Sequence, residues 1–459
     1  MEKVKKQKNP NKLTQKELWT WSLKGFSTSM NVMILGFLTI YCTNILGMNI
    51  ALVGTLMLAS RVLDIFTDMI IGYVVDKTNT KLGRGRPYEL CIIGTWASTV
   101  LLFSCPPSFS MVAKCIWVLS VYILVNSGFN SIMAAAQTPY IVRAFNNQEK
   151  YVALTSYGGL ITMLGAVVVN IGFPILMGTM ATSAKGWTTL ITIFAVPATL
   201  IGLLRFFFIP EKYNVDATTE HLDLKGMFKV LKSNKYIYQI AFITLISSIV
   251  ANMGVSVFYF TYVVKNVEAM GLTAAVQLLM VPIMFIFPPL LKKFAIRDVI
   301  LAGIIIQCIG CVIYWFAGAN LMIIILASIF VGIGAVPLSM LAGLMIIDCA
   351  EYNEWKGMHR LEATLSVIPN LTSNLGSAFG AFLLGVFLNG AGYISTVEGV
   401  TVDQPASAIL MLRLLVSFIP LALYILSAIT AKFYNLDKLM PQIRKENGEK
   451  HASILDIAE

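Results

Sequence analysis

Three charged residues inside an apolar stretch are the chain's clearest candidates for chemistry. Arg61, Asp64 and Asp68 stand at positions i, i+3 and i+7, so they share one face of a helix. Leu, Met, Ile and Ala side chains dominate the sequence on both sides of them. Two carboxylates and one guanidinium leave one negative charge in this stretch without a partner.

An ionised carboxylate at membrane depth costs roughly 3 kcal/mol or more, so it needs a partner or a bound cation. The unmatched charge of this motif is suited to binding a proton or a sodium ion. Two carboxylates one turn apart also titrate in separate steps, which favours a proton on one of them. The alternative interpretation is a structural ion pair that holds this helix to its neighbours.

The surrounding sequence has the composition of a membrane protein. The 459 residues are 57% hydrophobic and only 13% charged, whereas soluble domains contain about 25% charged residues. Hydrocarbon cannot hydrogen-bond exposed backbone, so spanning segments must be helices or closed barrels. The apolar runs are long and lack a period of two, which predicts an all-α membrane protein.

Twelve apolar runs of roughly 20 residues predict twelve transmembrane helices. They lie near 18–43, 51–75, 88–104, 113–142, 152–177, 188–209, 236–264, 271–291, 298–317, 320–348, 362–389 and 406–431. The predicted domains are a tail at 1–17, a six-helix bundle at 18–209, a linker at 210–235, a second six-helix bundle at 236–431 and a tail at 432–459.

The distribution of basic residues predicts the orientation. If the N-terminus is cytoplasmic, 28 of the 34 Lys and Arg residues lie in cytoplasmic segments, and only Lys185 and Lys265 lie in outside loops. This positive-inside pattern predicts an inner-membrane protein with both termini in the cytoplasm. It also accounts for the net charge of +10 without a nucleic-acid partner. Two six-helix halves predict the major facilitator fold, with a substrate site between the halves.

Four segments together resemble a known family. They read R-x-x-D-x-x-x-D-x-x-x-G-x-x-x-D at 61–76, G-R-G-R-P at 83–87, Q-T-P-Y at 137–140 and D-x-x-E-Y-x-E-W at 348–355. This set resembles the glycoside–pentoside–hexuronide cation symporters of the major facilitator superfamily. The resemblance extends over the whole chain, and the motif at 61–76 is long and specific.

The resemblance implies secondary active transport by alternating access, in which H+ or Na+ drives import of a sugar, glycoside or similar small organic solute. Asp64 and Asp68 match the family's cation carboxylates, Arg61 matches their partner, and Thr67 takes the place of an asparagine. Because Ala134 also replaces a threonine of the cation site, fewer oxygens are available, which favours a proton over sodium. No metal or organic cofactor is expected.

The resemblance also implies a cytoplasmic latch between the two halves. Its members would be charged residues of two loops predicted to face the same side, and salt bridges between them would bias which face is closed. The residues that match are Arg84, Arg86, Asp348, Glu351, Glu354 and Arg360. The alternative is that these are solvated loop charges that only obey the positive-inside rule.

The substrate site departs from the family's pattern. No Asp or Glu occurs between Glu17 and Asp64 or between Glu89 and Glu149, so the sugar-binding carboxylates of the first and fourth helices are missing. Carboxylates bind hydroxyls through charge-assisted hydrogen bonds, and neutral amides bind them more weakly. The sequence therefore predicts a neutral pocket for an uncharged glycoside or a less polar solute. Its candidate residues are Thr28, Asn130, Gln137, Tyr140, Tyr157 and Asn374.

The same residues leave one alternative function open. A proton-coupled transporter or efflux antiporter of a non-sugar amphiphile would use the same carboxylates. A membrane enzyme is not expected, because HExxH, GxSxG and Walker A motifs are absent and the three histidines lie in predicted loops or tails. The expected partners are a small-molecule substrate and membrane lipid, and the chain is expected to be a monomer.

Overall fold

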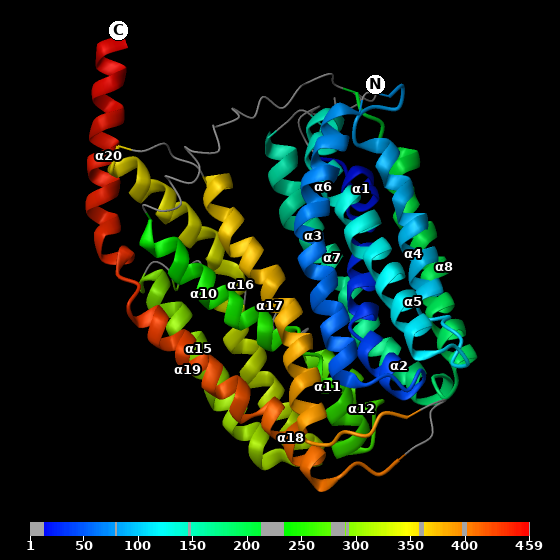
Figure 1. Cartoon of the computed structure of the whole chain (residues 1–459). Coiled ribbons are helices and arrows are strands. Elements are labelled where there is room, and N and C mark those ends of the chain that lie inside the picture. The colour runs from blue at the N-terminus through cyan, green and yellow to red at the C-terminus, as the bar shows by residue number, and fades with distance from the viewer. Residues whose placement is uncertain are drawn as a thin grey trace, which may run out of the picture. The chain divides into compact units, whose positions relative to one another are not determined.

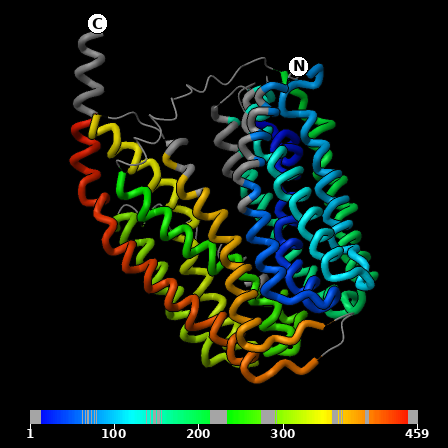
Figure 2. Tube along the Cα trace, viewed as in Figure 1, coloured from blue at the N-terminus to red at the C-terminus, as the bar shows by residue number. Residues whose placement is uncertain are grey.

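The computed structural model describes residues 13–78, 80–145, 148–212, 234–276, 290, 293–357, 362–396 and 402–458. Within these ranges the regular structure is helical, apart from one isolated bridge between Thr80 and Gly83. The path of the chain through these helices can be followed in Figure 1 and Figure 2.

The helices of the first half follow one another with short connections. They are α1 (Gln15–Leu35), α2 (Leu38–Asn44), α3 (Ile50–Lys77), the 3₁₀ helix η1 (Arg86–Leu90), α4 (Cys91–Leu102), α5 (Met111–Ile123), the π-helix η2 (Leu124–Asn130), α6 (Ser131–Phe145), α7 (Gln148–Met180) and α8 (Ala184–Phe208).

Ten further helical elements lie among the described residues of the second half. They are α10 (Lys235–Ala251), α11 (Val255–Phe258), the π-helix η3 (Tyr259–Val264), α12 (Ala269–Val276), α15 (Ile296–Ala317), α16 (Leu321–Trp355), α17 (Glu362–Gly390), α18 (Ala406–Val416), α19 (Phe418–Lys432) and α20 (Leu436–Ala458).

Nine helical stretches among the described residues are long and apolar enough to cross a membrane. The predicted run at 51–75 forms the 28-residue helix α3, and the run at 88–104 forms η1 and α4. Most of the run predicted at 271–291 lies outside the described residues. The total of twelve spans therefore stays a prediction.

The chain forms two compact units. Unit 1 comprises residues 1–49, 59–219 and 395–402, and unit 2 comprises residues 50–58, 220–394 and 403–459. Helix α3 is shared, because its first part groups with unit 2 and the rest with unit 1. The charged motif of α3 begins at Arg61, directly after this change of unit.

Unit 1 is held together by close helix approaches and by buried hydrogen bonds. Helix α1 packs against α7 where Gly165 has no side chain, since a Cβ there would lie 2.2 Å from the carbonyl oxygen of Phe26. Asn31 of α1 donates a 2.7 Å hydrogen bond to the buried hydroxyl of Thr99 on α4. Small residues and interhelical polar contacts of this kind stabilise helix packing where lipid removes the usual hydrophobic driving force.

Unit 2 uses the same means. Helices α15 and α16 meet at Gly303 and Gly334, where a Cβ on Gly334 would lie 2.4 Å from the carbonyl oxygen of Gly303. Between α10 and α17, the hydroxyls of Ser248 and Ser373 are 2.8 Å apart. These contacts fix the long helices that carry the acidic residues at the end of α16.

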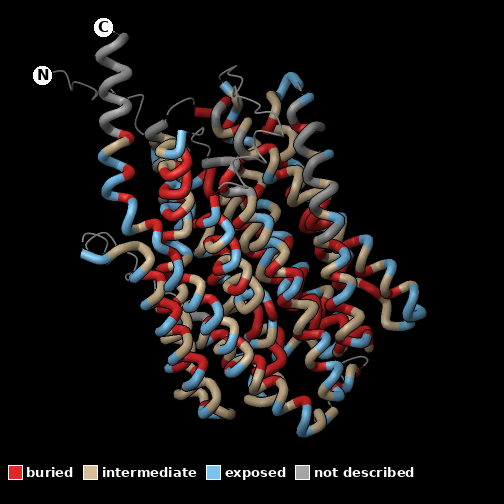
Figure 3. Tube along the Cα trace, turned by 60° about the vertical axis from the view of Figure 1, so that its left-hand side comes forward, coloured by how far each residue is buried: buried red, intermediate tan, exposed pale blue. Residues whose placement is uncertain are grey.

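The segment predicted as the C-terminal tail is helical. Helix α20 buries Leu436, Met440, Ile443 and Asn447, which recur at helical spacing and lie along one face. Figure 3 shows this alternation of buried and exposed residues along the helix. The buried face packs against the end of α16, so the first turns of α20 belong to the core of unit 2.

Candidate functional site

Asp64 has partners at both carboxylate oxygens. Arg61 Nη1 donates to Asp64 Oδ2 at 3.2 Å, and the Ser127 hydroxyl donates a short hydrogen bond to Asp64 Oδ1. The Asp64 side chain is 13% exposed and that of Arg61 is 30% exposed. The carboxylate is thus held in a defined position between a cation and a neutral donor.

Ser127 lies in η2, the π-helix that joins α5 to α6. A π-helical segment widens the turn and often marks a functional site, and here it brings a hydroxyl to the carboxylate of α3. Arg61 also interacts with Tyr122, which lies two residues before η2 begins. Neither Ser127 nor Tyr122 was predicted from the sequence. Their only signal was a small or polar residue inside an otherwise apolar run.

Asp68 and Thr67 lie on α3 one turn after Asp64. The Asp68 side chain lies outside the described residues. The Thr67 hydroxyl donates to the backbone carbonyls of Leu63 and Asp64, at 3.3 and 3.1 Å, so its lone pairs can still accept a hydrogen bond or bind a cation. The cation-coupling roles of these residues stay predictions.

A second charged cluster, which the sequence analysis missed, is fully buried in unit 1. The side chains of Arg205 and Glu89 are 1% and 0% exposed, with Arg205 Nε 3.7 Å from Glu89 Oε1. The guanidinium lies 3.3 Å from the centroid of the Trp21 ring and 4.7 Å from that of Tyr140. Its Nη1 donates to Gln137 Oε1 at 2.8 Å.

Lys24 adds a second positive charge to this cluster. It is buried on α1 and interacts electrostatically with both Glu89 and Arg205. The cluster therefore contains two cations and one carboxylate, with Glu89 as the shared counter-charge. The sequence offered no signal for it, since Glu89 and Arg205 stand 116 positions apart at the predicted ends of two spans and resemble ordinary loop charges.

Two of the predicted substrate residues belong to the buried cluster of unit 1. Gln137 and Tyr140 both contact Arg205, and the Tyr140 hydroxyl donates to the carbonyl of Ile209 at 2.5 Å. The Thr28 hydroxyl donates to backbone carbonyls of its own helix. Of the others, Asn130 is half-buried, Tyr157 is 59% exposed, and Asn374, in unit 2, is exposed. Their roles in binding stay predictions.

Three of the predicted latch residues, Asp348, Glu351 and Arg86, have hydrogen-bond partners within their own units. In unit 2, Arg444 of α20 donates to Asp348 at 2.8 Å and to Glu351 at 2.9 Å. In unit 1, Arg86 Nε donates to the carbonyl of Phe206 at 2.9 Å. Arg84 and Glu354 also have interactions, whereas Arg360 lies outside the described residues. The latch between the halves stays a prediction, and Arg444 is a partner that the sequence analysis did not expect.

The loop after α3 binds a carboxylate with its backbone. The N–H groups of Arg84, Gly85 and Arg86 donate to the two carboxylate oxygens of Glu211 at 2.9, 2.7 and 2.8 Å. Gly83 has φ +112° and approaches this carboxylate so closely that a Cβ there would overlap it. Successive N–H groups directed at one anion form a nest, and Glu211 fills this one.

Residues 209–212, which follow α8 and include Glu211, are held by two further hydrogen bonds. The Tyr140 hydroxyl binds the carbonyl of Ile209, and the N–H of Lys212 donates to the carbonyl of Arg143 at 2.9 Å. The end of α6, the 83–86 loop and the start of the linker are therefore joined as one body within unit 1.

Replacing Glu211 with alanine is expected to release the 83–86 loop. Three N–H groups would lose a charged acceptor, which at this partly exposed site corresponds to about 2 kcal/mol of local stability. Trypsin cleavage after Arg84 should then be roughly thirtyfold faster in the folded protein. Lys212→Gln is the matched control, because only the backbone of Lys212 takes part. Unchanged cleavage in the alanine variant would contradict the clamp.

The sequence model of the family described as "MFS/sugar transport protein" matches residues 27–438. The isoprimeverose transporter of Lactiplantibacillus pentosus is 26% identical over 451 residues, covering 96% of this chain and 93% of that protein. The raffinose carrier protein of Pediococcus pentosaceus is 26% identical over 381 residues, covering 78% of this chain and 57% of that protein.

Among solved structures, a bacterial homologue of the human lysosomal transporter Spinster is similar with a TM-score of 0.64. It is 14% identical, and the match covers 94% of this chain and 99% of that one. At this identity the likeness concerns the fold alone.

Proposed function

Because the chain belongs to the family of MFS/sugar transport proteins, we propose that it is a cation-coupled symporter that imports an uncharged sugar or glycoside by alternating access. The family match over residues 27–438 is the observation that carries this proposal. The chain is a multi-pass membrane transporter and not an enzyme, as the sequence predicted.

Two observations support a neutral oligosaccharide or glycoside as the substrate. The relatives named above are called an isoprimeverose transporter and a raffinose carrier, and both names denote sugars without charged groups. The first and fourth predicted spans of this chain contain no Asp or Glu, so hydroxyls must be bound by amide and hydroxyl side chains. The proposed contacts are Thr28, Asn130, Tyr157 and Asn374. Gln137 and Tyr140 would join them once their contacts with Arg205 are broken.

The coupling ion is proposed to be a proton. Asp64 is held by Arg61 and Ser127, and Asp68 follows one turn later on the same face. A carboxylate that carries the unmatched charge needs only one oxygen to bind a proton, whereas sodium requires a shell of several. The placement in the inner membrane with both termini cytoplasmic, and the monomeric state, are proposed on the positive-inside count and on the family.

The test is uptake by proteoliposomes that contain the purified protein. Isoprimeverose and raffinose are the probes, each supplied with an inward proton gradient, an inward sodium gradient or no gradient. Accumulation of either sugar only with the proton gradient supports the proposal in full. Accumulation with sodium alone would replace the ion, and outward transport of an amphiphile without uptake of either sugar would favour the efflux antiporter instead.

A further inference from the structure

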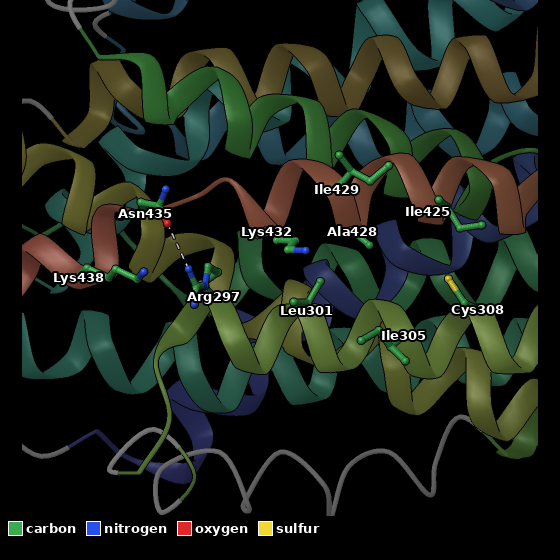
Figure 4. Close-up of a pocket in the computed structure, with 10 residues that line it drawn as sticks. All are labelled: Arg297, Leu301, Ile305, Cys308, Ile425, Ala428, Ile429, Lys432, Asn435 and Lys438. Atoms are coloured by element: carbon green, nitrogen blue, oxygen red, sulfur yellow. Dashed lines mark hydrogen bonds between the residues drawn. The ribbon is translucent and has the colours of Figure 1, made fainter.

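Unit 2 contains a groove between α15 and the α19–α20 connection that plays no part in the proposed transport site. It has a volume of about 680 Å³. Figure 4 shows its lining, with cationic residues gathered at one end and apolar residues at the other. This division along the length of the groove is the pattern that a phospholipid requires.

The apolar end is formed by two neighbouring helices. Leu301, Ile305 and Cys308 line it from α15, and Ile425, Ala428 and Ile429 line it from α19. Ile305, Ile425 and Ile429 are each about half exposed. In a chain that spans a membrane, an exposed isoleucine-lined channel between two helices faces acyl chains.

The charged end lies where α15 begins and α19 ends. Arg297 is held in place, since its guanidinium donates to Asp298 at 2.8 Å and to Asn435 at 3.3 Å. The backbone N–H of Arg297 donates to the Asp437 carboxylate at 2.6 Å. Asp298 and Asp437 thus face Arg297. Lys432 and Lys438 are exposed and have no ion pair among the described residues.

We propose that this groove binds one anionic phospholipid, with its phosphate between Lys432, Lys438 and Arg297 and one acyl chain along the isoleucines. Three cations face two carboxylates at the headgroup end, so the site has a net positive charge that a phosphate would neutralise. Basic pockets between transmembrane helices on the cytoplasmic side bind anionic headgroups, and the positive-inside count places this end in the cytoplasm. A free phosphate would leave the apolar half of the groove empty.

A bound lipid would join α15 to the start of α20. Two hydrogen bonds already link this region. The backbone N–H of Arg297 donates to the Asp437 carboxylate, and the Arg297 guanidinium donates to the Asn435 side chain. Helix α20 carries Arg444, which binds Asp348 and Glu351 at the end of α16. A lipid that fixes the start of α20 would therefore stabilise these two ion pairs.

The direct test is binding of dioleoyl-phosphatidylglycerol to the purified full-length protein, measured by native mass spectrometry and by the lipid-dependent rise in unfolding temperature. Each lysine near a membrane surface contributes about fivefold to the affinity for an anionic lipid, so Lys432→Gln with Lys438→Gln should weaken binding about thirtyfold. The matched control carries Lys81→Gln with Lys212→Gln, two exposed lysines of unit 1. Its affinity for phosphatidylglycerol should stay unchanged.

A second variant tests the acyl half of the site. Ala428→Trp keeps both lysines but fills the groove, and it should weaken phosphatidylglycerol binding while leaving the protein folded. Equal stabilisation by dioleoyl-phosphatidylcholine or by inorganic phosphate would overturn the proposal. Unchanged phosphatidylglycerol affinity in the double lysine variant would overturn it as well.

Discussion

Replacing Asp64 with asparagine is expected to abolish accumulation of the solute and to leave the protein folded. Asparagine has nearly the same shape but cannot bind a proton or hold the charge of Arg61. One charge moved through 100 mV corresponds to about 2.3 kcal/mol, enough for roughly fiftyfold accumulation. The internal-to-external ratio in proteoliposomes should therefore fall from about fifty to one at that potential, while exchange of internal for external solute persists.

The matched control is Ser127→Ala, which removes the neutral donor to Asp64 and keeps the carboxylate. It should lower the rate of uptake but preserve accumulation. The structural ion-pair alternative predicts another outcome, in which Asp64→Asn loses thermal stability and exchange together. If both Asp64→Asn and Asp68→Asn still accumulate solute, the coupling assignment is wrong.

Replacing Glu89 with glutamine is expected to destabilise unit 1 strongly. Glu89 is the one carboxylate shared by the buried cations Lys24 and Arg205, so its loss leaves two positive charges without compensation. Removing one partner of a buried ion pair costs about 3–5 kcal/mol. Thermal unfolding in detergent micelles should show a correspondingly large fall in the unfolding temperature.

The order of three variants tests this cause. Arg205→Met leaves Lys24 and Glu89 as a balanced pair, although it also removes the hydrogen bond to Gln137 and the stacking on Trp21. Combining Glu89→Gln with Arg205→Met removes one charge of each sign. The double variant should therefore unfold at a higher temperature than Glu89→Gln alone. The reverse order would show that the cluster is held by packing and not by its charge balance.

Stability and transport should separate in these two experiments. Asp64 is a partly exposed carboxylate beside one cation, whereas Glu89 is enclosed on all sides. Asp64→Asn is thus expected to uncouple a stable protein, and Glu89→Gln to weaken the protein while the molecules that remain folded still accumulate solute.

The sequence by itself determined the class of the protein. A lipid bilayer requires helices of a minimum length, because backbone N–H and C=O groups must be hydrogen-bonded within the segment. Such segments are visible in the sequence as long apolar runs. The motif at 61–76 indicated the family, which the match over residues 27–438 confirmed. The pairing of Arg61 with Asp64 was also predictable, because residues three apart on a helix are neighbours whatever the rest of the chain does.

Only the tertiary structure decided which distant residues meet. Ser127 reaches Asp64 through a π-helical turn that has no sequence signature, and Glu89 meets Arg205 although each looks like a loop charge. Two of the acids predicted to form a latch, Asp348 and Glu351, are bound by Arg444 from a segment that the sequence predicted only as a tail. The physical reason is that helical periodicity fixes neighbours within a few residues, whereas contacts between helices depend on how their faces pack.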